Sequence, residues 1–116
     1  MQIEKFKSEV ATLKKFFELY CHDHHDNRKI HQKQLLYKNE TVDVNLELCD
    51  ECMELLQYSF DRLLECPHDP KPMCRSCPNP CYEKPQWKKV AKLMRYSGMQ
   101  LGLLKVKRFI KNMLSK

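Results

Sequence analysis

The chain has 116 residues, which predicts a single domain over residues 1–116 with a core of modest size. Seven cysteines accompany only two glycines, and 21 Lys and Arg face 15 Asp and Glu. No apolar stretch approaches the roughly 20 residues that cross a bilayer, and the first residues lack the apolar run of a signal peptide. An odd cysteine count also suits a disulfide scaffold poorly. The chain is therefore expected to be a metal-binding protein of the reducing cytoplasm, without a membrane segment.

A first amphipathic helix is predicted over residues 3–20, because apolar side chains recur there at steps of three and four residues. These side chains are Ile3, Phe6, Val10, Leu13, Phe17 and Tyr20. The helix runs directly into the sequence Cys-His-Asp-His-His at residues 21–25. Residues 26–42 are mainly polar and basic and are interpreted as a connection.

A second helix is predicted over about residues 44–65. Asp43 or Asn45 can serve as its N-cap, because either side chain accepts hydrogen bonds from the free amides of a first turn. Cys49 and Cys52 would then lie on one face of this helix, three residues apart.

All six prolines lie within nineteen residues, so residues 66–83 are predicted to be irregular. Pro85 suits the first turn of a third helix over about residues 84–97, and Gly98 suits its end. A last amphipathic helix is predicted over about residues 99–114. The expected fold is all-α: about four helices and an irregular Cys/Pro-rich loop, held together by metal.

Charge is unevenly distributed. Residues 83–116 hold ten Lys and Arg and one acid, a net charge of +9, whereas residues 1–82 hold eleven and fourteen, a net charge of −3. The basic helical part, residues 84–116, could contact nucleic acid or an acidic protein partner. A solvated helix face with a basic bias is the alternative.

The Cys/Pro-rich loop carries a first set of candidate ligands. Its four thiols fall within sixteen residues, and four thiolates complete the coordination shell of zinc or of an iron–sulfur cluster. They belong to Cys66, Cys74, Cys77 and Cys81. Their spacing slightly favours a cluster, such as [4Fe–4S], over zinc, and both remain open.

A second set of candidate ligands comes from the predicted helices. Cys21 is four residues from His25 and three from His24, so either imidazole can share a helix face with the Cys21 thiol. Together with Cys49 and Cys52 they supply three thiolates and one imidazole, a set that suits zinc. A redox role for the Cys49–Cys52 dithiol is disfavoured, because that role needs a preceding strand and none is predicted.

The order of these motifs resembles the bacterial "nitrous oxide-stimulated promoter" family of small cysteine-rich proteins, over about residues 10–100. The resemblance rests on Tyr20-Cys21-x-x-His24-His25, Leu48-Cys49-x-x-Cys52, Tyr58, Arg62-Leu63, Cys66-Pro67, Lys71-Pro72-x-Cys74-x-x-Cys77-Pro78-x-x-Cys81-Tyr82 and Met94-Arg95-Tyr96-Ser97-Gly98. It implies a metal or iron–sulfur protein with a role in nitrosative stress. The chain departs from the family at Pro80, where His is usual, and at Met99-Gln100, where Pro-Arg is usual.

Two functions are therefore expected. The first is a metal-binding stress protein whose thiolate-ligated cluster senses, traps or helps repair nitric oxide damage. The second is a zinc-stabilised module whose basic C-terminal helices bind nucleic acid or an acidic protein. Catalysis is not favoured, since the sequence has no Gly-rich phosphate loop and no nucleophile elbow.

Overall fold

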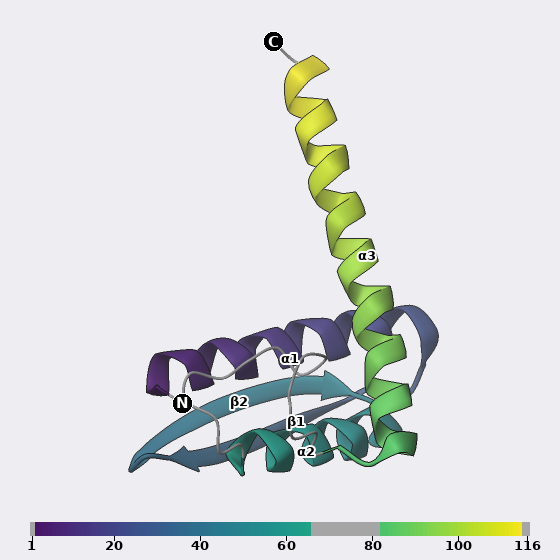
Figure 1. Cartoon of the computed structure of the whole chain (residues 1–116). Coiled ribbons are helices and arrows are strands. Elements are labelled where there is room, and N and C mark those ends of the chain that lie inside the picture. The colour runs from purple at the N-terminus through teal and green to yellow at the C-terminus, as the bar shows by residue number, and fades with distance from the viewer. Residues whose placement is uncertain (1, 66–81, 115–116) are drawn as a thin grey trace.

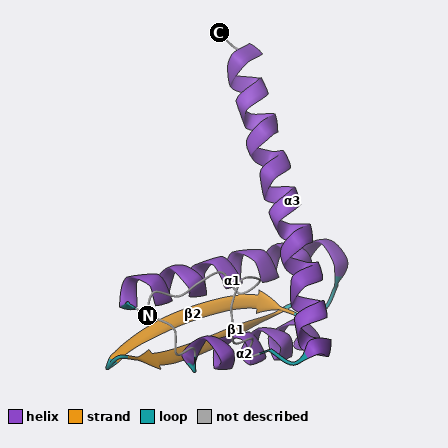
Figure 2. Ribbon diagram, viewed as in Figure 1, coloured by secondary structure: helices purple, strands orange, loops and turns teal. Residues whose placement is uncertain are grey.

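The computed structural model describes residues 2–65 and 82–114 of the chain, with side chains as far as residue 102. Three helices and one β-hairpin make up the described part, as Figures 1 and 2 show. In chain order they are α1 (Ile3–His24), β1 (Lys29–Tyr37), β2 (Glu40–Leu48), α2 (Asp50–Leu64) and α3 (Lys84–Leu114). The fold is therefore mixed α/β.

The predicted all-α fold of four helices is wrong, because residues 29–48 form a two-stranded antiparallel sheet. Apolar and polar residues alternate along β2, which is the pattern of a half-buried strand rather than of a helix. Val44, Leu46 and Leu48 point into the core, and the residues between them are exposed. The sequence already contains this two-residue alternation, in a segment that is predicted to be part of the helix over residues 44–65.

The hairpin turns tightly at Lys38 and Asn39, whose φ angles are 49° and 65°. Two consecutive left-handed residues define a type I′ turn, whose twist matches that of paired strands. The turn sets Tyr37 opposite Glu40 and thereby fixes the register of the whole hairpin. The predicted connection over residues 26–42 is therefore largely strand and turn.

The predicted apolar stripe of α1 is confirmed. Phe6, Val10, Leu13 and Phe17 are buried in the core, while Ile3 and Tyr20 are partly buried at its margin. The helix continues for one more turn than predicted, so Cys21 is also fully buried on this face.

The second helix begins later than predicted, at Asp50, and neither Asp43 nor Asn45 caps it. Its N-cap is Cys49, whose backbone is extended and whose sulfur accepts the N–H of Cys52. From there the helix presents one buried face to the core. Its buried members are Cys52, Leu56, Phe60 and Leu63.

The two predicted C-terminal helices are one continuous helix, α3, that runs through Gly98. A single glycine costs only about 1 kcal/mol relative to alanine inside a helix, so packing can override it. The neighbouring Ser97 is fully buried and donates a hydrogen bond of 2.7 Å to the Phe16 carbonyl of α1. Beyond this contact, α3 projects away from the body of the protein (Figure 1).

Among the described residues, no helix combines the length and the apolar character needed to cross a membrane.

Two adjacent leucines test the hairpin directly. Leu35 is 5 % exposed and Leu36 is 68 % exposed, because successive side chains of a strand point to opposite faces. We expect Leu35→Ala to lower the free energy of unfolding by about 2–5 kcal/mol in a urea titration. Leu36→Ala should change it by no more than about 0.5 kcal/mol. Equal losses of unfolding free energy in Leu35→Ala and Leu36→Ala would contradict the assignment of β1 as a strand.

Candidate metal centre

Four metal-ligating side chains converge where α1, β2 and α2 meet. They belong to Cys21, His25, Cys49 and Cys52, and their ligand atoms all lie within 4.8 Å of one another. Cys21 at the end of α1 precedes Cys49 at the junction of β2 and α2 by 28 residues, so this cluster is a product of the tertiary fold. It is also the set predicted from the sequence, with His25 as the imidazole.

The C-terminal end of α1 supplies Cys21 and His25. Cys21 lies in the last turn of the helix and is fully buried. His25 is the C-cap, and its backbone N–H donates to the Cys21 carbonyl at 2.8 Å. This hydrogen bond keeps the helical i, i+4 relation across the end of the helix, so that both side chains reach the same point.

The junction of β2 and α2 supplies Cys49 and Cys52 as the N-cap and the third residue of the helix. The N-cap side chain normally accepts the amide of the second or third helical residue. Here the Cys49 sulfur does so, from the Cys52 N–H at 3.4 Å, and the two thiols are thereby brought together. The Cys49 N–H in turn donates to the Cys21 sulfur at 3.3 Å and links the junction to α1.

The distances suit tetrahedral coordination. The Nδ1 atom of His25 lies 3.5 Å from the Cys49 sulfur and 3.2 Å from the Cys52 sulfur. Around a zinc ion with Zn–S bonds of 2.3 Å and a Zn–N bond of 2.0–2.1 Å, such nitrogen–sulfur pairs lie about 3.6 Å apart and sulfur pairs about 3.8 Å apart. Binding would therefore move the ligand atoms by about 1 Å or less.

Burial controls the protonation of these thiols. Loss of hydration raises the pKa of Cys21 and, more strongly, that of Cys52, and their thiol neighbours raise the pKa of Cys52 further. Both shifts favour the protonated thiol in the absence of a cation. A metal ion would reverse this balance, because it stabilises thiolates and displaces their protons. Three thiolates and one imidazole are a donor set that binds zinc.

Neighbouring side chains, which the sequence did not indicate, hold the centre in place. Arg28 donates to the His25 carbonyl at 2.8 Å and lies 3.8 Å from the Glu47 carboxylate, so it joins the cap of α1 to β2. The Nε2–H of His31 donates to the Leu48 carbonyl at 3.2 Å, directly before Cys49. Only the strand pairing, which places Ile30 opposite Glu47, brings these residues to the site.

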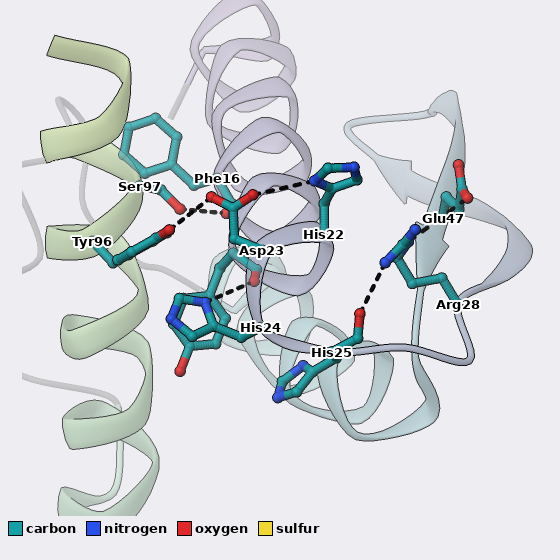
Figure 3. A network of polar contacts seen from close by, with 10 residues as sticks. Phe16, His22, Asp23, His24, His25, Arg28, Glu47, Tyr96 and Ser97 are labelled. Carbon is teal, nitrogen blue, oxygen red and sulfur yellow. Dashed lines mark hydrogen bonds and ion pairs between the residues drawn. The ribbon is translucent and has the colours of Figure 1, made fainter. Parts of the chain in front are cut away.

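His24, the alternative imidazole, lies outside the cluster. Its Nδ1–H donates to the Tyr20 carbonyl at 3.1 Å, and its ring stacks on Tyr20. In Figure 3 it points toward α3, where its ring contacts Tyr96 at a centroid distance of 4.4 Å. The Tyr96 hydroxyl also donates to Asp23 at 2.7 Å, which lowers the pKa of that carboxyl group. His24 therefore belongs to the contact between α1 and α3.

One side of the cluster opens to solvent. A groove of about 750 Å³ borders it, and the groove includes His25 and Cys49 in its lining. Asp26, Asp50 and Glu51 are exposed along the same groove. Arg28 and Lys29 line the groove as well, and Lys29 pairs with Asp50 at 3.3 Å, so the groove gives solvent access to the site but is not strongly acidic.

The four loop cysteines, Cys66, Cys74, Cys77 and Cys81, lie outside the described residues. So does most of the predicted irregular segment 66–83. The prediction that these thiols form a separate ligand set stays untested.

The sequence predicts no strand before Cys49, and a redox role for the Cys49–Cys52 dithiol is disfavoured for that reason. The structure shows that β2 does precede Cys49. The dithiol follows β2 and starts α2, the strand–helix context of many redox-active pairs. A pair with that role needs no further ligands. Here Cys21 and His25 complete a set of four around the pair, and this arrangement favours metal binding.

The fold and the site thus define a small mixed α/β protein with a Cys₃His cluster of metal-ligating residues. Over residues 4–116 the chain matches the family described as nitrous oxide-stimulated promoter, and it belongs to that family. No curated protein and no solved structure matches it.

The two neighbouring histidines give a matched test of the ligand set. We expect His25→Ala to lose about one equivalent of zinc or cobalt per chain, because the imidazole that faces both thiols is removed. His24→Ala should keep the full metal content. Metal analysis of the purified proteins, with the absorption bands of tetrahedral cobalt thiolate as a second readout, checks both. A larger loss in His24→Ala would show that the wrong imidazole has been assigned.

Metal removal should also lower stability, because the centre joins three elements. A ligand present at 100 times its Kd stabilises the folded state by about 2.7 kcal/mol. In a domain of this size that corresponds to a melting temperature about 10 °C higher. We expect a chelator to lower the melting temperature of the native chain by this order, and Cys52→Ser to show a clearly smaller shift. The same shift in both proteins would contradict a metal at this centre.

Proposed function

We propose that this protein is a metal-thiolate protein of the nitrosative stress response, in which a structural zinc at the Cys₃His cluster organises the fold around a reactive thiolate site. The convergence of Cys21, His25, Cys49 and Cys52 within 4.8 Å carries this proposal. Membership of the nitrous oxide-stimulated promoter family supports the link to nitrogen oxides.

The structural role of the first centre follows from its surroundings. Three of its four ligands are nearly or fully buried, and all four come from the ends of regular elements. A zinc site with four protein ligands has no open coordination position for a substrate, which is the arrangement of structural rather than catalytic zinc. The ion would hold the end of α1 against the start of α2.

The reactive site in this proposal is formed by the thiolates of Cys66, Cys74, Cys77 and Cys81, which bind an iron–sulfur cluster. Support comes from the sequence: four thiols at short spacing with adjacent prolines, in a segment that an ordinary core does not require. Nitric oxide attacks iron–sulfur clusters readily, because iron binds nitric oxide in place of its sulfur ligands. A cluster on a small protein could thus sense, trap or help repair nitrosative damage.

Visible absorption after anaerobic purification tests whether an iron–sulfur cluster and a structural zinc occupy two separate sites. We expect a brown protein that nitric oxide bleaches. Cys77→Ala should abolish the colour, because it removes one of the four proposed cluster ligands. Cys49→Ala should keep the colour and lose about one equivalent of zinc, because the two sets are separate.

Three outcomes would count against the proposal in different ways. A colourless native protein with about two zinc ions per chain would exclude the cluster but keep the Cys₃His centre. Loss of colour in both variants would show one shared or coupled site. A coloured protein that nitric oxide leaves unchanged would separate the cluster from nitrosative stress.

A further inference from the structure

The N-terminal part of α3 has a strongly basic face. We define it by Lys84, Lys88, Lys92 and Arg95, all exposed. At 3.6 residues per turn these four side chains fall within an arc of about 80°, and at 1.5 Å per residue they extend over about 17 Å of the helix. The four charges therefore form a straight row along the helix and are not scattered around its surface.

Nothing in the described structure neutralises this row. None of the four cations forms an ion pair with another described residue, whereas Lys5 and Lys7 of α1 are paired with Glu9 and Glu40. Glu83 is the only acid in residues 83–116, and it precedes the helix. Four unpaired cations on one helix face repel one another, and a polyanion would relieve that repulsion.

Among the described residues, the buried side chains of α3 lie on the side of the helix opposite the basic face. Val90, Leu93 and Ser97 are buried, and they lie about half a turn away from the basic row. Figure 1 shows the first half of α3 at the edge of the described structure, beside the end of α1, and its second half projecting away from the body. The basic row thus faces outward.

The composition of this face distinguishes between two kinds of partner. A protein interface needs an apolar centre surrounded by polar residues. Between Lys84 and Arg95 no large apolar side chain is exposed, and the exposed Met99 lies beyond the end of the row. Recognition by charge without apolar contact is typical of binding to phosphates.

We propose that the basic face of α3 docks on the phosphate backbone of duplex DNA, without base-specific readout. An α-helix is 10–12 Å across and the major groove of B-DNA is about 12 Å wide, so the row can follow the edge of the groove. Lysines act as point charges along the strand, and three or four contacts give weak, salt-dependent binding. This inference does not depend on which metal the protein binds.

The test compares two triple variants with the same change of net charge. One is Lys88→Gln/Lys92→Gln/Arg95→Gln on the basic face, and the other is Lys5→Gln/Lys7→Gln/Lys15→Gln on exposed positions of α1. Binding to a fluorescent 20-base-pair duplex is measured by anisotropy between 50 and 200 mM salt. Glutamine preserves helix propensity, and circular dichroism checks that both variants fold.

The slope of log Kobs against log salt changes by about 0.9 for each phosphate contact. We expect the α3 variant to reduce that slope by nearly 3 and to weaken binding at 50 mM salt by at least about tenfold. The α1 variant should differ from the native chain by less than about threefold. If both triple variants bound the duplex equally weakly, the loss of affinity would follow from net charge alone, and the proposal would be overturned. Binding of poly-L-glutamate as tight as that of the duplex would overturn it in favour of an acidic protein partner.

Discussion

The structure depends on one constraint: three thiols and an imidazole meet within 4.8 Å at the edge of the core. Polar groups in such a place need partners, and burial raises the pKa of the Cys21 and Cys52 thiols. A metal ion bound there would turn this unfavourable arrangement into a crosslink between the end of α1 and the start of α2. Under the proposed function, that crosslink would help a chain of modest length, with a small core, to hold its elements together.

The hairpin is what makes this convergence possible. Its type I′ turn sets the register, and the register places His31 and Glu47 beside the residues that carry the ligands. β2 then ends at Leu48, so that Cys49 begins α2 as its cap with an exposed acidic first turn after it. The centre is therefore built from element ends, where backbone amides are free to hydrogen-bond to sulfur.

The two halves of the protein carry different chemistry. The body around α1 and α2 holds the ligands, with carboxylates along the groove beside them. The projecting helix α3 holds most of the excess positive charge and is attached to the body by Ser97 and Tyr96, next to the ligand-bearing turn of α1. The cluster of metal-ligating residues and the basic face therefore lie on different elements, which meet at the contact between α1 and α3.

The sequence by itself determined the buried stripe of α1, the apolar face of α2 and the four residue types of the Cys₃His set, because these follow from local spacing. It also contained the alternation of β2, which the helical interpretation of residues 44–65 overlooked. The choice between His24 and His25 could not be made locally, since both lie on reachable faces of the helix end. In the structure His24 packs against Tyr20 and Tyr96, whereas His25 faces the thiols of Cys49 and Cys52. Likewise, packing of Ser97 on α1 carried α3 through Gly98, because tertiary contacts outweigh the small helix penalty of one glycine.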